Sequence, residues 1–140
     1  TLGGDPVAAL LIDIDHFKKI NDTFGHDVGD EVLREFGLRL ASNVRAIDLP
    51  CRYGGEEFTV IMPDTQLADA MRIAERIRLH VAGSPFRVMG GRELLTVTIS
   101  IGVAATAGEG DRPESLLKRA DEAVYEAKAS GRNAVVGKAA

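Results

Sequence analysis

Two kinds of apolar pattern recur along the chain. Val7–Ile14 is nearly continuously aliphatic, which is typical of a central strand buried on both faces. Within 28–44, Leu33, Phe36, Leu40 and Val44 recur at three- and four-residue steps, which predicts a helix with one apolar face. Further strands are expected at Leu49–Tyr53, Phe58–Met62, Phe86–Met89, Leu94–Ala105 and Asn133–Val136, and further helices at His16–Thr23, Leu67–Val81 and Pro113–Ala129.

The predicted order is β-α-α-β-β-α-β-β-α-β, with helices alternating with strand pairs. A single mixed sheet with helices packed on it satisfies this order most simply, which predicts an α/β fold. We expect the first strand to lie beside the first hairpin. That arrangement would bring Asp13-Ile14-Asp15 close to Glu56-Glu57.

The bulk composition limits the class of protein. The 140 residues are 45% hydrophobic, which suits one compact domain, and the formal net charge of -4 argues against binding to nucleic acid. No apolar stretch approaches the roughly 20 residues of a membrane span, and no signal peptide precedes the first strand, so a cytoplasmic location is expected. The single cysteine, Cys51, fits a reducing compartment and is expected to be buried in a strand. The abrupt start at Thr1 suggests a piece cut from a longer protein.

Acidic residues gather at two predicted turns. Glu56 and Glu57 follow two glycines at the tip of the first hairpin, and Asp13 and Asp15 close the first strand. Oxygen ligands of this kind suit Mg²⁺ together with a polyphosphate. Read alone, Asp15 is equally well explained as a solvated strand-end residue. Asp13 with Glu56 is better explained by a metal, because so apolar a strand does not need an acid near its core.

Cationic and polar residues surround these acids in the sequence. Lys18 begins a predicted helix, where an anion would compensate its unfavourable interaction with the helix dipole. Lys128 and Arg132 lie four residues apart and could hold phosphate, although cations near a helix C-terminus also have a structural explanation. Asn21 and Asp30 offer the donors and acceptors that a guanine edge requires, and equally suit a turn and a helix start.

Four motifs, in order, resemble those of the GGDEF family of diguanylate cyclases. They are Asp13–Asp22 (DIDHFKKIND), Gly25–Asp30 (GHDVGD), Arg52–Phe58 (RYGGEEF), and Ala120–Lys128 (ADEAVYEAK) followed by Gly131-Arg132-Asn133. The resemblance spans nearly the whole chain. It implies a palm-like α+β domain with a central mixed five-stranded sheet flanked by helices, plus a small hairpin.

The resemblance also implies a reaction and its residues. Two GTP would condense to cyclic di-GMP with release of two pyrophosphates, at the interface of a homodimer. Mg²⁺, which Mn²⁺ can replace, would be bound by Asp13, the Ile14 carbonyl and Glu56. Glu56 is favoured as the base that deprotonates the 3′-hydroxyl, with Glu57 as the alternative. Phosphates would be held by His16, Phe17, Lys18, Lys128 and Arg132, with Lys18 also stabilising the transition state, and guanine would be read by Asn21 and Asp30.

A second site and one departure follow from the same resemblance. Arg45, Asp48 and Arg76 match the family's product-inhibition site, although Arg45 and Asp48 alone could be a surface ion pair. The helix that usually precedes the first strand is absent, and receiver domains are expected upstream in the full-length protein. The alternative function is a non-catalytic cyclic di-GMP receptor or dimerisation module.

Overall fold

The computed structural model describes residues 5–52, 55–106 and 111–139. Within them, five strands form one mixed sheet in the order β2-β3-β1-β6-β7. β1 is central, as its aliphatic sequence predicts, and pairs antiparallel with both β3 and β6. The strands of this sheet are β1 (Val7–Ile14), β2 (Leu49–Arg52), β3 (Glu57–Pro63), β6 (Ile99–Ala105) and β7 (Ala134–Lys138).

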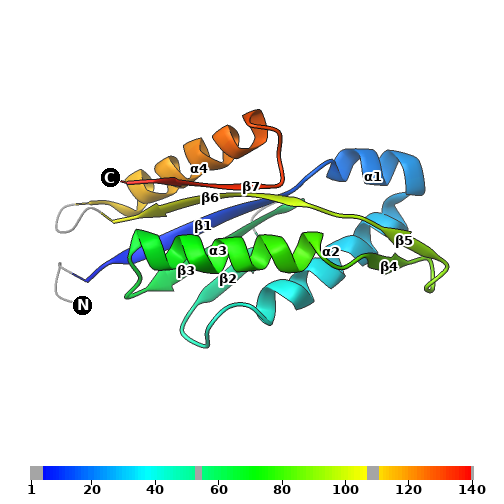
Figure 1. Ribbon diagram of the computed structural model, residues 1–140, viewed down its shortest axis with the longest axis horizontal. Coiled ribbons are helices and arrows are strands. Elements are labelled where there is room, and N and C mark those ends of the chain that lie inside the picture. The colour runs from blue at the N-terminus through cyan, green and yellow to red at the C-terminus, as the bar shows by residue number, and fades with distance from the viewer. Residues whose placement is uncertain (1–4, 53–54, 107–110, 140) are drawn as a thin grey trace.

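Helices cover both faces of the sheet (Figure 1). The helices are α1 (Phe17–Phe24), α2 (His26–Ala41), α3 (Leu67–Ala82) and α4 (Pro113–Ala129). Alternate residues of β1 point to opposite faces. Leu10 and Ile12 belong to the main core, which also contains Phe36 of α2 and Ile77 of α3, whereas Ala9 packs against α4 residues. Asp13 shares the α4 face with Ala9, because the two are four residues apart in one strand.

The predicted strand Leu94–Ala105 is divided in the structure. Its first part is β5 (Glu93–Leu95), which forms a separate hairpin with β4 (Phe86–Val88), and its second part is β6. Residues 96–98 between them join no strand. Thr98 instead bonds Asp15 through both its carbonyl oxygen and its hydroxyl group. The expected small hairpin is confirmed, with one strand boundary that periodicity alone did not indicate.

The prediction that Cys51 is buried is wrong. β2 is an edge strand, and all four of its residues are exposed, including Cys51. Tyr53 and Gly54, which belong to the predicted hairpin, lie outside the described residues.

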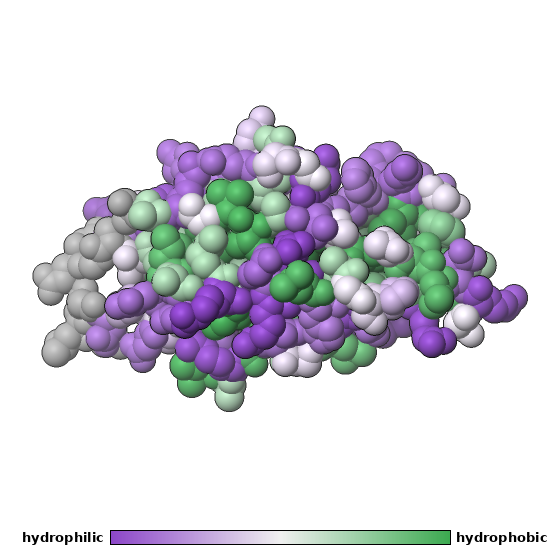
Figure 2. All heavy atoms as spheres, viewed as in Figure 1, coloured by the Kyte–Doolittle hydropathy of each residue, from purple (hydrophilic) through white to green (hydrophobic). Residues whose placement is uncertain are grey.

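Among residues 5–52, 55–106 and 111–139, no helix combines the length and apolar composition that a bilayer crossing requires. On the face that Figure 2 shows, polar side chains separate the exposed apolar side chains into patches.

Candidate active site

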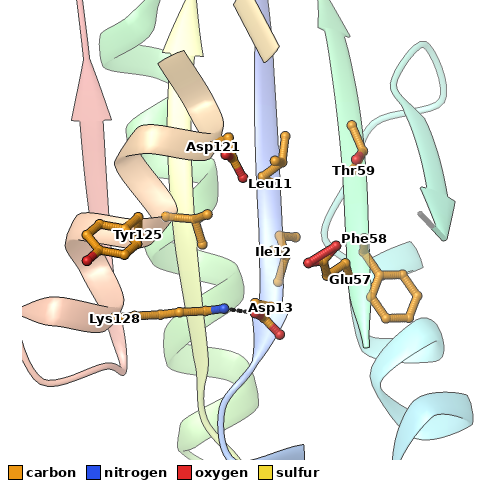
Figure 3. Close-up of a pocket in the computed structure, with 10 residues that line it drawn as sticks. Leu11, Ile12, Asp13, Glu57, Phe58, Thr59, Asp121, Tyr125 and Lys128 are labelled. Atoms are coloured by element: carbon orange, nitrogen blue, oxygen red, sulfur yellow. Dashed lines mark ion pairs between the residues drawn. The ribbon is translucent and has the colours of Figure 1, made fainter. Parts of the chain in front are cut away.

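The pairing of β1 with β3 brings the two acidic segments together. Asp13 lies opposite Glu57 in the antiparallel register, and the N–H of Ile14 donates to the carbonyl oxygen of Glu56 over 3.2 Å. Directly opposed residues of antiparallel strands project to the same face. Asp13 and Glu57 therefore share the α4 face, while Phe58 points toward α2 on the other side (Figure 3). The predicted proximity of the first strand's end to the acidic hairpin is confirmed.

The end of β1 and the acidic hairpin form a corner of the sheet, which Lys128 reaches from the last turn of α4. Its ammonium group forms an ion pair with the Asp13 carboxylate (Figure 3). Burial raises the pKa of Asp13, and the nearby Glu56 and Asp15 charges raise it further, while the Lys128 contact lowers it. An anionic corner that is partly buried attracts a cation, and the lysine supplies one here.

The donor set fits a magnesium ion. No group of three or more His, Cys, Asp or Glu side chains converges as a metal site among the described residues. Mg²⁺ does not require one, because it binds through one or two carboxylates plus phosphate oxygens and water. Asp13 and Glu56 are close enough for Glu56 to raise the pKa of Asp13, and the main chain of Ile14 is hydrogen-bonded to that of Glu56. The structure therefore places Asp13 and the Glu56 main chain close to each other, as a shared ion would require.

Asp15 does not share this arrangement with Asp13. It lies beyond the end of β1, is 5% exposed, and accepts hydrogen bonds from Thr98 Oγ1 (2.8 Å), Ser100 Oγ (2.6 Å) and the N–H of Asn133 (2.9 Å). Ser100, which lies opposite Asp13 in the β1–β6 register, is one of these donors, so Asp15 contacts the side of the sheet that Asp13 faces. The interpretation of Asp15 as a solvated residue is wrong, because its side chain is buried.

The candidate phosphate residues lie on two segments that meet at Asp15. His16 precedes α1 with a positive φ of 58°, and Phe17 is the first residue of that helix. Lys18 is fully exposed and pairs with Asp22 one helical turn later, which raises the pKa of Lys18. Arg132 is exposed just beyond α4, also with a positive φ, of 67°.

The candidate guanine residues come from α1 and α2. Asn21 packs beneath Gly29, where an added Cβ would overlap Asn21 Oδ1. This oxygen is buried, and none of the described residues donates a hydrogen bond to it. Asp30, next to Gly29, is exposed and lines a pocket that also includes Phe58. A buried acceptor that receives no hydrogen bond from the described residues, near the exposed Asp30 carboxylate, suits a ligand with adjacent N–H donors.

The residues of the proposed inhibitory site gather at the far end of α2. The Arg45 guanidinium pairs with the buried Asp48 carboxylate over 2.7 Å and donates to Thr65 Oγ1 over 2.6 Å. Arg76 of α3 donates to the carbonyl oxygen of Asn43, two residues before Arg45. The i,i+3 ion pair considered from the sequence is present, and Arg76, also expected at this site, contacts the chain two residues before Arg45.

Some residues that contact these sites were not identified from the sequence. Gln66 is the N-cap of α3, and Thr65, just before it, contacts Arg45. Thr98 and Ser100 contact Asp15 from a segment that is otherwise apolar. Their hydroxyl groups are the one signal that could have marked them.

Comparison with known proteins agrees with this geometry. The family described as "Diguanylate cyclase, GGDEF domain" matches residues 2–134. The response regulator PleD of Caulobacter vibrioides (strain NA1000 / CB15N) is 86% identical over 140 residues, which are 100% of this chain and 31% of PleD. Diguanylate cyclase DosC of Escherichia coli (strain K12) is 42% identical over 132 residues, or 94% of this chain and 28% of DosC. The chain thus spans about a third of the length of these relatives.

Solved structures share the fold. The coiled coil and GGDEF domain of DgcB from Caulobacter crescentus, in complex with c-di-GMP, superposes with a TM-score of 0.91 at 34% identity, covering 97% of this chain and 71% of that one. The active GGEEF domain of a diguanylate cyclase from Vibrio cholerae superposes with a TM-score of 0.85 at 36% identity, covering 95% and 83%. With the family match over residues 2–134, these likenesses show that the chain belongs to the GGDEF domain family of diguanylate cyclases.

Proposed function

We propose that this chain is the catalytic domain of a diguanylate cyclase. It condenses two GTP into cyclic di-GMP and releases two pyrophosphates, with one GTP bound to each of two copies. The observation that carries the proposal is the corner where Asp13, the Ile14–Glu56 main-chain bond and Lys128 meet. Family membership and the DosC relative, which is named a diguanylate cyclase, support the same reaction.

The proposed binding roles follow from position and charge. Asp13, the Ile14 carbonyl and Glu56 would hold Mg²⁺, or Mn²⁺ in its place. When bound, such an ion neutralises phosphate charge and lowers the pKa of the attacking hydroxyl. When the triphosphate binds, the ammonium group of Lys128 would leave the Asp13 carboxylate and bind a phosphate oxygen. The phosphates would also be held by Lys18, Arg132 and the N–H groups of His16 and Phe17.

The proposed chemistry is an in-line displacement. Each 3′-oxygen attacks the α-phosphorus of the GTP on the other copy, and the bond from that phosphorus to the bridging oxygen of the β-phosphate breaks. Pyrophosphate leaves with the electron pair of that bond. The proton of the 3′-hydroxyl passes to Glu56, with Glu57 as the alternative acceptor. Two such steps, one on each GTP, close the ring.

Asn21 and Asp30 would select guanine. An ionised carboxylate accepts from both N1–H and the N2 amine, and adenine lacks this pair of donors. The unpartnered Oδ1 of Asn21 supports this role, because buried polar atoms in folded proteins are nearly always hydrogen-bonded.

A turnover assay tests the proposal. The chain is fused to a dimerising coiled coil and given GTP with Mg²⁺, and pyrophosphate and cyclic di-GMP are measured. We expect Glu56→Gln to lose at least about a hundredfold in kcat, because the substitution removes both a metal ligand and the proton acceptor. In the unfused chain, the rate per copy is expected to rise with protein concentration. Absence of product from the fused wild type, or equal rates for Glu56→Gln, would overturn the cyclase assignment.

Feedback by the product is proposed at a second site. Arg45, Asp48 and Arg76 would bind cyclic di-GMP, since guanidinium groups pair with guanine O6 and N7 and with phosphate. The convergence of Arg45 with Asp48 and of Arg76 with Asn43 favours this proposal. A chain that binds cyclic di-GMP here without turnover would be the receptor that is the alternative function. The relative PleD is named a response regulator, and by analogy we propose that receiver domains drive dimerisation in the full-length protein.

A further inference from the structure

A buried carboxylate joins three segments beside the proposed active site. Asp15 stands between β1 and α1, its N–H donates to the Thr98 carbonyl oxygen over 2.9 Å, and its side chain is 5% exposed. Its Oδ1 accepts from Ser100, and its Oδ2 accepts from Thr98 and from the N–H of Asn133. The proposed mechanism gives this carboxylate no role.

The third segment is a turn that needs support. α4 ends at Ala129, and Arg132 N–H then donates back to the Ala127 carbonyl oxygen over 3.1 Å. Arg132 and Asn133 both have positive φ, of 67° and 47°. A left-handed conformation is unfavourable for residues with a Cβ, although asparagine tolerates it better than most. Two such residues in succession persist only where the surroundings hold them.

Two contacts hold this turn at different atoms of Asn133. Asp15 accepts the backbone N–H of Asn133 over 2.9 Å, and Arg78 of α3 donates to the Asn133 side-chain oxygen over 2.9 Å. The Asp15 contact is a hydrogen bond to a buried carboxylate, which is stronger than a neutral one. The position of Arg132 therefore depends on Asp15, although the two side chains are not bonded to each other.

We propose that Asp15 is a positioning residue for the triphosphate. Through one carboxylate it holds Arg132 on one side of the phosphate site and the start of α1, with the N–H groups of His16 and Phe17, on the other. Asp15 touches no substrate. It sets the distance between two groups of phosphate donors that lie more than a hundred residues apart in the sequence. The inference rests on the proposed function and adds a residue that the proposed reaction does not itself use.

Nucleotide binding by the unfused chain tests the inference without turnover. The probes are 3′-deoxy-GTP, which lacks the attacking hydroxyl, and GMP, which lacks the two outer phosphates, each titrated with Mg²⁺ in a calorimeter. We expect Asp15→Ala to weaken the binding of 3′-deoxy-GTP by about tenfold, as is typical when a residue that orients a ligand-binding group is removed. GMP binding is expected to change by less than about twofold, because Asn21 and Asp30 are untouched.

A conservative variant separates positioning from charge. Asp15→Asn keeps a side-chain oxygen that can accept the Asn133 N–H, and the Ser100 hydroxyl can turn to accept from the new amide. We expect this variant to recover most of the lost affinity for 3′-deoxy-GTP. Should Asp15→Ala fail to fold, Asp15→Ser replaces it, since serine keeps a polar group in the corner and removes the carboxylate.

A matched control measures general destabilisation. Asp111, near the start of α4, is also a buried carboxylate and pairs with Arg119 over 2.7 Å. Asp111→Ala is expected to lower the melting temperature and leave the ratio of the two nucleotide affinities unchanged. Equal losses for 3′-deoxy-GTP and GMP in Asp15→Ala, no loss for either, or no recovery in Asp15→Asn would each overturn the positioning role. If the wild type binds neither nucleotide, the proposed function itself fails.

Discussion

Replacing Lys128 by methionine is expected to change metal binding in opposite directions, depending on whether a nucleotide is present. In the structure the ammonium group of Lys128 pairs with Asp13, the carboxylate that we propose as a metal ligand. A metal arriving alone must displace this ammonium group. A metal arriving with a triphosphate offers the lysine new oxygens. Lys128 should therefore oppose the first event and favour the second.

The size of the expected change in metal affinity follows from how exposed the Lys128–Asp13 ion pair is. The Asp13 side chain is 9% exposed and the Lys128 side chain is 37% exposed. Two unit charges about 4 Å apart attract by about 4 kcal/mol at an effective dielectric constant of about 20. Solvent around the lysine reduces this to about 1 kcal/mol, the upper range for partly exposed pairs. That free energy corresponds to about fivefold in a dissociation constant.

The assay uses Mn²⁺ as the probe, with free ion followed by electron paramagnetic resonance. Without nucleotide, Lys128→Met is expected to bind Mn²⁺ about fivefold more tightly than the wild type. The Mn²⁺ complex of 3′-deoxy-GTP is expected to bind about fivefold more weakly, because a phosphate contact is lost. The coupling between metal and nucleotide thus falls by about 25-fold, the product of the two changes.

A control on the same helix removes a charge without touching the corner. Lys118 of α4 is exposed and lines a different pocket from Lys128. Lys118→Met is expected to leave both constants within about twofold. Weaker or unchanged Mn²⁺ binding by Lys128→Met in the absence of nucleotide would refute the competition between lysine and metal.

Three further predictions concern other parts of the molecule. Gly29→Ala places a Cβ against Asn21 Oδ1 and is expected to weaken GTP binding by about tenfold in calorimetry. Gly37→Ala, which has open space around the added Cβ, is expected to leave GTP binding unchanged. Equal GTP affinities of the two variants would contradict the proposed guanine role of Asn21. Asp13→Asn is expected to raise the melting temperature at pH 7. Burial raises the pKa of Asp13, so the contribution of this carboxyl group to stability is full below pH 3.8, its ordinary pKa, and is lost as the pH rises through the folded pKa. A gain in melting temperature that persists at pH 3 would contradict this cause. Arg45→Ala is expected to weaken cyclic di-GMP binding by about tenfold or more and to leave the initial rate of GTP turnover unchanged; retained inhibition by the product would exclude this site.

The sequence determined most of the elements and the proximity of the two acidic segments. The aliphatic run of β1 required burial on both faces, and this placed the strand at the centre of the sheet. The predicted helices match α2, α3 and α4 to within a few residues. Local patterns sufficed for these elements because the spacing of apolar residues along the chain shows which face of a helix or strand is buried and which is exposed to water. The proximity of Asp13 to the acidic hairpin followed from topology alone.

Only the tertiary structure decided which partner each charged group takes. Asp13 and Asp15 are two residues apart, yet one carboxylate faces Lys128 and the other faces Ser100 and Asn133. The strand ends between them, and no residue type marks that end. Contacts across more than eighty residues of chain depend on how the sheet and the helices pack together, so two carboxylates two residues apart in sequence can take different partners.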